Sequence, residues 1–335
     1  MAQITGSFGR VVIDKEQSYK TPKATPAGWV IPFTTCGLAS DQNLLESNTI
    51  TSDRNPQEPG LGQVNVSGDL AVELGGLAHT RLIYLALGDY SVTAQDPDAT
   101  PGSGDEYYEH TIKVGSSIPS FITEIRFSDG AGLTRYAKFD GCKIATWSFS
   151  LRTDAFAEST FSITGSSETF TSTEYDSSPD DVGFGPFTTY NATLKIGGSS
   201  AASITEISFN VNNNLDENTF AIGTGSVRTQ LPEGRVGIDG NFTAQFTDDT
   251  LTYIDMAQNS QETSLVIELA RGNGSGTTGN EYLKIEFPEI KLRPPRKEIT
   301  GPQGVFLTFN FFAYADDSDS AIIVTAKNQI QDLSI

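Results

Sequence analysis

Two stretches of this chain, residues 62–74 and 234–246, carry the same alternating pattern of apolar and polar residue types. Apolar side chains recur at alternate positions in both stretches, which is the period of a strand with one face on a core. The two stretches are offset by 234 − 62 = 172 residues. A repeat of this length in a chain of 335 residues predicts two related β domains in tandem.

Two further matches follow in the same order. Residues 136–144 match residues 282–290, and residues 158–163 match residues 304–309, both with an offset of 282 − 136 = 146. The difference, 172 − 146 = 26, indicates extra residues in the first copy. The stretch 89–117 is rich in Asp, Pro, Gly and Ser, so we predict a long loop there. Similar strand patterns recur in any β protein, and it is the shared order of the matches that favours a duplication.

Composition favours short strands, because Gly, Thr, Ser, Phe and Tyr are abundant and typical helical stretches are scarce. One short helix is expected after the repeated strand in each copy, at 77–87 and 250–258. The predicted fold is mainly β, with two tandem β-sandwich domains that each carry one short flanking helix. The expected parts are an N-terminal arm (1–30), a first β domain (31–167) containing the long loop (89–117), a linker (168–187), a second β domain (188–315) and a C-terminal tail (316–335).

The chain is acidic, with a net charge of −20. Such a surface repels phosphates, which disfavours tight binding of nucleic acid but suits a nucleic acid that must slide past. Acidity also keeps a protein soluble, which is the simpler explanation. Cys36 and Cys142 give no disulfide framework, and we identify no signal peptide or membrane-spanning segment. We therefore expect folding in a reducing cytosol.

Catalytic chemistry has few candidate residues. His79 and His110 are the two histidines, and we expect both to be structural or solvent-facing. The sequence therefore predicts no catalytic residue, no metal site and no cofactor, although a Ser-His-Asp set assembled in space stays open. Carboxylates at Asp96, Asp98, Asp105 and Glu106 could ligate calcium, but their spacing matches no known calcium loop.

A basic cluster interrupts the acidic chain near its end. It consists of Lys291, Arg293, Arg296 and Lys297. We expect it to contact an acidic surface of an identical neighbour, and a solvated loop has similar weight.

Several short motifs, taken in order, resemble the tail tube proteins, or major tail proteins, of long-tailed bacteriophages. The resemblance covers most of the chain. It is carried by Tyr19, Thr21 and Pro22, by Pro32, Phe33 and Thr34, by residues 50–54, by Val66, Ser67, Gly68 and Asp69 with Glu73, and by residues 139–144.

The resemblance implies tail-tube-like β-sandwich domains whose sheets join edge to edge around a ring, and rings that stack into a tube for DNA. Family members mostly supply one such domain per chain and form six-membered rings, whereas this chain carries two. We therefore expect three chains per ring, in a pseudo-sixfold arrangement that leaves no exposed sheet edge. The competing arrangement is a hexamer in which one copy lines the tube and the other decorates the outside.

The polar faces of the repeated strands are the expected lumen surface, although they could equally face outward. The lumen candidates are Asn65, Ser67, Asp69, Glu73, Asp239, Asn241 and Gln245. Contacts between rings or subunits are expected at Asp96, Asp98, Asp105 and Glu106 of the long loop and at the four basic residues. The expected partners are further copies of the chain, other tail proteins at the tube ends, a tape-measure protein in the lumen and DNA as a cargo that does not adhere. The expected location is the virion tail, after assembly in the host cytoplasm and without a membrane.

Two other classes of function compete with this interpretation. A carbohydrate-binding or adhesive β-sandwich would expose aromatic residues in a shallow groove, and Trp29 and Trp147 are the two tryptophans available. A β-sandwich hydrolase would need more histidine chemistry than this chain offers.

Overall fold

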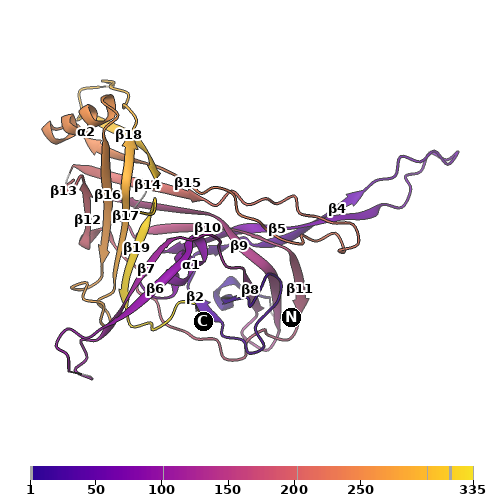
Figure 1. Cartoon of the computed structure of the whole chain (residues 1–335). Coiled ribbons are helices and arrows are strands. Elements are labelled where there is room, and N and C mark those ends of the chain that lie inside the picture. Colours follow the sequence, from indigo (N-terminus) through magenta and orange to yellow (C-terminus); the bar gives the residue numbers. More distant parts are fainter. Residues whose placement is uncertain (1–2, 101, 202, 300, 317–318, 335) are drawn as a thin grey trace.

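The computed structural model describes residues 3–100, 102–201, 203–299, 301–316 and 319–334, and it confirms a mainly β fold (Figure 1). The first strands are β1 (Arg10–Lys15), β2 (Trp29–Ile31), β3 (Thr35–Cys36), β4 (Ala39–Leu45), β5 (Gly60–Glu73), β6 (Gly88–Gln95), β7 (Tyr107–Val114), β8 (Phe121–Ser128), β9 (Thr134–Arg152), β10 (Glu158–Gly165) and β11 (Ser167–Thr171). The later strands are β12 (Ala192–Ile196), β13 (Ser199–Ser200), β14 (Ile204–Asn212), β15 (Gly237–Gln245), β16 (Glu262–Ala270), β17 (Tyr282–Leu292), β18 (Phe306–Tyr314) and β19 (Ile323–Asn328). The helices are α1 (Ala78–Leu87) and α2 (Asp248–Gln258), with 3-10 turns η1 (Gly6–Phe8) and η2 (Thr189–Asn191).

The two copies share one pattern of antiparallel strand pairing. In the first copy, β9 pairs with β8 and β11 through its first half and with β10 through its second half. Strands β1 and β2 extend the sheet beyond β8, while β5, β3 and β4 extend it beyond β10. In the second copy β17 takes the place of β9, and the places of β8, β11, β10, β1, β2, β5 and β4 are taken by β16, β19, β18, β12, β13, β15 and β14. Strand β3 has no counterpart among the described strands of the second copy.

The strand register moves one of the predicted matches by two residues. Phe161 of β10 lies opposite Leu70 of β5, and Phe309 of β18 lies opposite Phe242 of β15. Because 242 − 70 = 172, the equivalent of Phe161 is Phe309, at an offset of 309 − 161 = 148 rather than 146. A shift of two residues keeps every side chain on the same face, so the apolar alternation could not reveal it.

The extra residues of the first copy lie where the offsets place them, but the predicted long loop (89–117) is largely strand. Strands β6 and β7 pair over their whole length as a hairpin, and only the tip between them is a loop. On β7, His110 and Ile112 are buried while their neighbours are more exposed, which is the alternation of a strand. The hairpin also pairs with β19, so the insertion widens the sheet.

The predicted arm, linker and tail are corrected in the same way. Strand β1, in the expected arm, lies between β2 and β8 with Val11 and Ile13 fully buried. Strand β11 falls in the expected linker and β19 in the expected tail, yet each pairs with the first half of the long strand of its own copy. Composition did not indicate these strands, because the residues around them are polar. The division into two domains otherwise remains a prediction.

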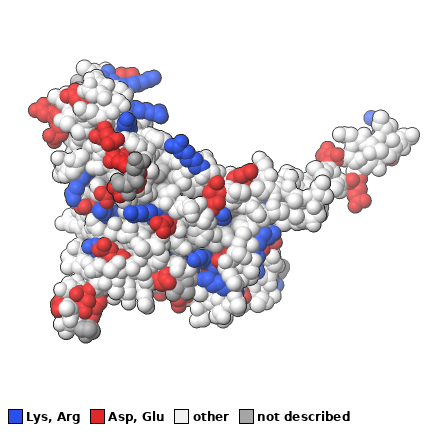
Figure 2. Space-filling model, viewed as in Figure 1, with Lys and Arg blue, Asp and Glu red and all other residues white. Residues whose placement is uncertain are grey.

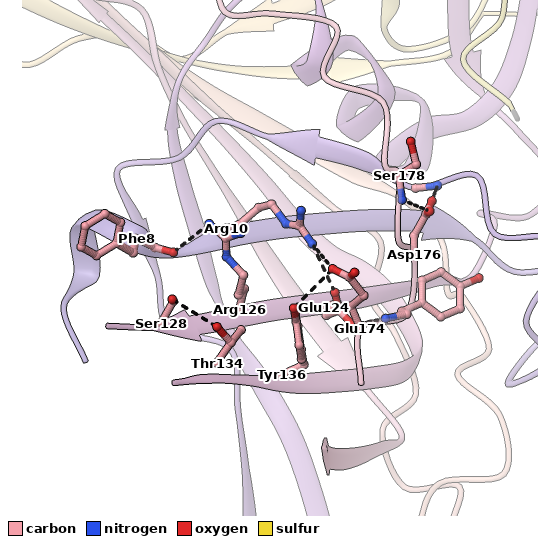
Figure 3. A network of polar contacts seen from close by, with 12 residues as sticks. Phe8, Arg10, Glu124, Arg126, Ser128, Thr134, Tyr136, Glu174, Asp176 and Ser178 are labelled. Carbon is pink, nitrogen blue, oxygen red and sulfur yellow. Dashed lines mark hydrogen bonds and ion pairs between the residues drawn. The ribbon is translucent and has the colours of Figure 1, made fainter. Parts of the chain in front are cut away.

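Polar contacts fasten these segments to the first copy. Figure 3 shows Arg10 of β1 directed at two carboxylates, Glu174 at 3.2 Å and Glu124 at 4.0 Å. The Tyr136 hydroxyl donates a hydrogen bond to Glu174 at 3.3 Å, and the backbone N–H of Tyr175 donates to Glu124. The stretch after β11 therefore runs across the sheet of β1, β8 and β9 as a bound segment.

An eight-strand sheet spans both copies. Strand β14 of the second copy pairs with β9 of the first through seven residue pairs, from Glu206 opposite Arg152 to Asn212 opposite Thr146. The order is β4, β5, β10, β9, β14, β15, β18 and β17. Behind this seam Phe209 of β14 packs with its ring centroid 5.1 Å from that of Trp147 and 5.1 Å from that of Phe149. The junction between the copies is thus a paired sheet over an aromatic core.

Candidate assembly interface

One face of the eight-strand sheet is polar across both copies. Directly opposed residues on neighbouring strands point to the same face, so the register defines rows of side chains. A groove of about 320 Å³, lined by residues of β9, β10, β14 and β15, hollows this face at the seam. One row runs through Glu73, Glu158, Ser150, Ser208, Asn241 and Asn310, and the next through Ala71, Thr160, Ser148, Asn210, Asp239 and Phe312.

The seven lumen candidates lie on this one face. They form two groups, on β5 and β15, which the structure separates by β10, β9 and β14. Asp69 accepts a hydrogen bond from Ser162 at 2.6 Å, whereas Asn65 accepts one from Arg228 at 2.9 Å and so belongs to a contact between the copies. The remaining candidates are Ser67, Glu73, Asp239, Asn241 and Gln245.

Sequence reasoning missed the middle of the polar face. The missed residues come from β9, β10 and β14, and they are small and neutral except for three charged groups. Arg152 pairs with Glu206 at 2.8 Å, which leaves the carboxylates of this face in excess. Alternation of serine with aromatic residues in 147–150 was the available signal. The missed set is Thr146, Ser148, Ser150, Arg152, Glu158, Thr160, Ser162, Glu206, Ser208 and Asn210.

The sheet has an open edge at each end. Strand β4 pairs with β5 on one side, and no described strand pairs with its other side. At the opposite end, β17 covers β18 only at residues 311–314, so the outer edge of 306–309 has no strand partner among the described residues. Pro294 and Pro295 follow β17, and because proline has no N–H and a fixed φ, the strand ends there.

The basic cluster lies at this second open edge. Lys291 lies opposite Phe312 of β18, and its ammonium is 5.8 Å from the centre of the Tyr314 ring. The backbone N–H of Arg293 donates to the Asn310 carbonyl at 2.8 Å. Beyond that bond, the segment containing Arg293 and Arg296 stands away from β18, and a groove of about 980 Å³ opens between them. Lys297 is exposed on the same segment.

The acidic loop residues occupy a different part of the molecule. Figure 2 shows acidic side chains at the tip of the β6–β7 hairpin, at lower left, and basic ones at the top, over the end of β17. Ligand atoms of Asp96, Asp98 and Asp105 lie within 4.8 Å of one another, and Ser103 donates a hydrogen bond to two of these carboxylates. Glu106 accepts from the Gly104 N–H at 2.9 Å. The structure therefore does not unite the acidic and basic candidates in one site.

Both histidines are buried and bonded to other groups. The His79 Nδ1 atom accepts from the Gly75 N–H at 2.9 Å, and its Nε2 atom lies 2.7 Å from the Pro32 carbonyl oxygen. Burial lowers the pKa of His79 to about 4, so its ring is neutral at pH 7. The Nε2 atom of His110 lies 3.0 Å from the amide oxygen of Asn328, and burial lowers the pKa of His110 as well. Their positions agree with the structural role expected of them.

A family model described as phage tail tube protein matches residues 6–313 of this chain. No curated protein matches the chain. No helix in the described part of the chain is long and apolar enough to cross a membrane. The match covers both copies, and the β-rich fold agrees with it. The chain therefore belongs to the phage tail tube proteins, a structural and non-enzymatic family of the virion tail whose members associate with copies of themselves.

Proposed function

We propose that three copies of this chain close a ring of six β domains, and that stacked rings form the tube through which DNA passes from capsid to cell. The observation that supports the proposal is the pairing of β9 with β14, which joins the two copies edge to edge inside one chain. Repeating that junction between chains uses the two open edges, at β4 and at residues 306–309 of β18. A closed ring removes edges that would otherwise pair at random.

The junction between chains cannot copy the internal one in full. In the internal junction, β9 supplies residues 146–152 to β14. The matching part of the second copy contains Pro294 and Pro295, which cannot donate ladder hydrogen bonds. The basic cluster borders this edge, while the β4–β5 hairpin carries Asp41, Glu46 and Glu58. Opposite charges would therefore orient the hairpin of one chain on the open edge of the next.

The polar face is the surface we assign to the bore. Its carboxylates, among them Asp69, Glu158 and Asp239, outnumber its described basic groups. Negative potential keeps the DNA backbone from adhering, so DNA could move without sequence-dependent contacts. The same bore would hold a tape-measure protein before DNA enters, and other tail proteins would cap the tube. Assembly would take place in the cytoplasm of the host.

A shared sheet favours the trimeric arrangement over its competitor. In a hexamer with one decorating copy, the second copy would leave the sheet that lines the bore. One row of polar residues instead runs from Glu73 of β5 to Asn310 of β18 without a break. The carbohydrate-binding alternative would need exposed aromatic rings to contact a sugar, and Trp29 and Trp147 are only 4% and 0% exposed.

Contact between rings is assigned to the tip of the β6–β7 hairpin, which extends from the body of the molecule (Figure 1). Deleting residues 96–104 removes the acidic tip and leaves both strands. The expected product is a soluble ring that does not elongate, seen by negative-stain electron microscopy. Tubes of normal length from this variant would show that the tip has no part in stacking.

The test of the ring is electron microscopy of the purified protein combined with native mass spectrometry. Three chains of 36.0 kDa give a ring of about 108 kDa with six lobes in end-on views. Six chains per ring would support the decorated hexamer. A uniform monomer at high concentration would contradict both arrangements.

A further inference from the structure

Two loops at matching places in the copies adopt different positions. The docked loop (213–236) joins β14 to β15 and lies against the first copy, whereas the projecting arm (42–64), formed by the ends of β4 and β5, extends away from the body (Figure 1). In the docked loop Leu231 is 1% exposed. In the projecting arm Leu44, Leu45 and Leu61 are 61%, 60% and 69% exposed. An arm with such apolar exposure fits a surface that the single chain does not supply.

The two loops share sequence and backbone conformation. Both begin with Asn-Leu-x-Glu, at 43–46 and 214–217, and both later contain Ser-x-Arg, at 52–54 and 226–228. Ser52 has a φ of 61° and Ser226 a φ of 64°, an unusual left-handed conformation for serine in both cases. Arg54 is therefore the counterpart of Arg228.

Arg228 is the main contact of the docked loop. Its side chain is buried, and it donates to the carbonyl oxygen of Gly165 at 3.0 Å and to the side-chain oxygen of Asn65 at 2.9 Å. Its own carbonyl accepts from the Ser166 hydroxyl at 2.7 Å. Two residues earlier, the carbonyl of Ser226 accepts from the Val64 N–H at 2.9 Å. The docked loop thus forms hydrogen bonds with residues 64–65 of β5 and with residues 165–166 at the end of β10.

We propose that the projecting arm of one chain docks on the second copy of the neighbouring chain in the same ring, with Arg54 in the role that Arg228 has inside the chain. The proposal rests on the proposed ring, because only a closed ring places a second copy beside every projecting arm. It names a partner surface that the ring alone does not specify.

The receiving surface follows from the two offsets. The equivalent of Val64 is Val236, since 236 − 64 = 172, and the equivalent of Ser166 is Tyr314, since 314 − 166 = 148. The Tyr314 hydroxyl donates to the carboxylate of Glu262, and Glu289 of β17 lies opposite Tyr314 in the strand register. The like charge of these carboxylates favours an arriving guanidinium, and Lys291 over the Tyr314 ring is the neighbouring cation of this surface.

A pair of cysteines tests the contact. In a Cys36→Ser background, Ser52→Cys with Val236→Cys should form a disulfide between chains when rings assemble, because these positions correspond to the bonded pair Ser226 and Val64. Non-reducing electrophoresis should show covalent species that end at three chains. The matched control, Val64→Cys with Ser226→Cys, should close within one chain and keep the mobility of a monomer.

A charge reversal at Arg54 tests its role in the docking. Arg54→Glu should lower the yield of rings about tenfold or more, without changing the unfolding of the monomer, since Arg54 is exposed. Adding Glu289→Arg to Arg54→Glu should restore ring formation in part. The readout is the ring fraction in native mass spectrometry.

The outcomes of these experiments distinguish a failure of the docking proposal from a failure of the proposed ring. Wild-type rings with no covalent trimer from the cysteine pair, and normal ring yield for Arg54→Glu, would overturn the docking and leave the ring intact. Covalent species larger than three chains, appearing only in tubes, would place the arm on the adjacent ring and also overturn it. Absence of rings in the wild-type protein would refute the proposed function first.

Discussion

The two helices occupy matching places in the copies, yet they differ in how much of them the chain covers. All ten residues of α1 are buried, whereas α2 buries Thr250, Tyr253, Ile254 and Ala257 and exposes most of the rest. His79, in the core beneath the first copy's extra segments, corresponds to Leu251, which is 47% exposed, since 251 − 79 = 172. The two copies therefore share an arrangement of strands and helix, but the helix is covered in the first copy and partly exposed in the second.

The cover over α1 includes side chains of β1 and β2 and of the stretch after β11. Arg81 of α1 lies 3.5 Å from Asp14 and 4.6 Å from the centre of the Trp29 ring. Asp14 also accepts hydrogen bonds from Lys23 at 2.9 Å and from the Tyr175 hydroxyl at 3.0 Å. The helix of the first copy is therefore covered within the chain, whereas the helix of the second copy keeps an exposed face in the single chain.

The largest effect is expected at the seam between the copies. Phe209→Ala removes a ring that packs on Trp147, Phe149 and Phe287, with centroid distances of 5.1, 5.1 and 5.2 Å. The expected loss of unfolding free energy is about 3–5 kcal/mol, because the cavity would be lined by large rings of β9 and β17 that cannot collapse freely. Urea denaturation measures it.

The matched control is Phe170→Ala, since Phe170 is 62% exposed and its loss should change the unfolding free energy by less than about 1 kcal/mol. Two separate unfolding transitions in wild type would indicate that the seam does not couple the copies. A single transition that splits in Phe209→Ala would confirm the coupling.

A pH dependence should distinguish the first copy from the second. The pKa of His79 is lowered to about 4, chiefly by burial, while the unfolded value is near 6.5. Between these values the unfolded chain binds a proton that the folded chain does not, so stability falls as pH falls from 6.5 to 4, by about 3 kcal/mol in total. The neutral ring also accepts from the Gly75 N–H, which a charged ring cannot do.

His79→Gln supplies a donor and an acceptor without a charge change. The difference in unfolding free energy between wild type and this variant should therefore shrink or reverse as pH is lowered through this window. A difference that is constant from pH 7 to pH 4 would show that His79 does not titrate on unfolding.

The sequence predicted the fold well where a pattern repeats. The strands around 62–74 and 234–246, the helix after each and the site of the insertion all follow from residue alternation and offsets. Strands β1, β11 and β19 were assigned to arm, linker and tail because composition describes a segment alone, and their pairing depends on distant partners. In each case, pairing with a distant strand determined the structure even though the local sequence did not indicate a strand.

The polar face was predictable only in part. The candidates on β5 and β15 could be found from the repeat, because the repeat marks equivalent strands. Ser148 and Asn210 belong to the same row as Asp239, but that row exists through the pairing of β9 with β14, which joins residues 148 and 210. No alternation within one segment indicates which segment of another domain will pair with it.

Matched substitutions in the docked loop and the projecting arm should change monomer stability by different amounts. Arg228→Ala leaves the buried acceptors of Gly165 and Asn65 without a donor, and the expected cost is about 2–3 kcal/mol of monomer stability. Arg54→Ala should change monomer stability by less than about 0.5 kcal/mol, because Arg54 is exposed in the single chain. Thermal unfolding of the unassembled protein measures both. Equal losses would mean that the projecting arm already packs in the monomer.

The smallest effect is expected on the open face of α2. Leu251→Ala should change the unfolding free energy of the unassembled chain by less than about 0.5 kcal/mol, since its side chain is 47% exposed. Ile254→Ala on the same helix, 5% exposed, should cost about 2–4 kcal/mol and serves as the control for helix integrity. If the two variants lose similar amounts, α2 is covered in the monomer as α1 is, and the contrast between the copies fails. If Leu251→Ala instead lowers the stability of assembled rings alone, the open face of α2 is a surface that a neighbouring chain covers.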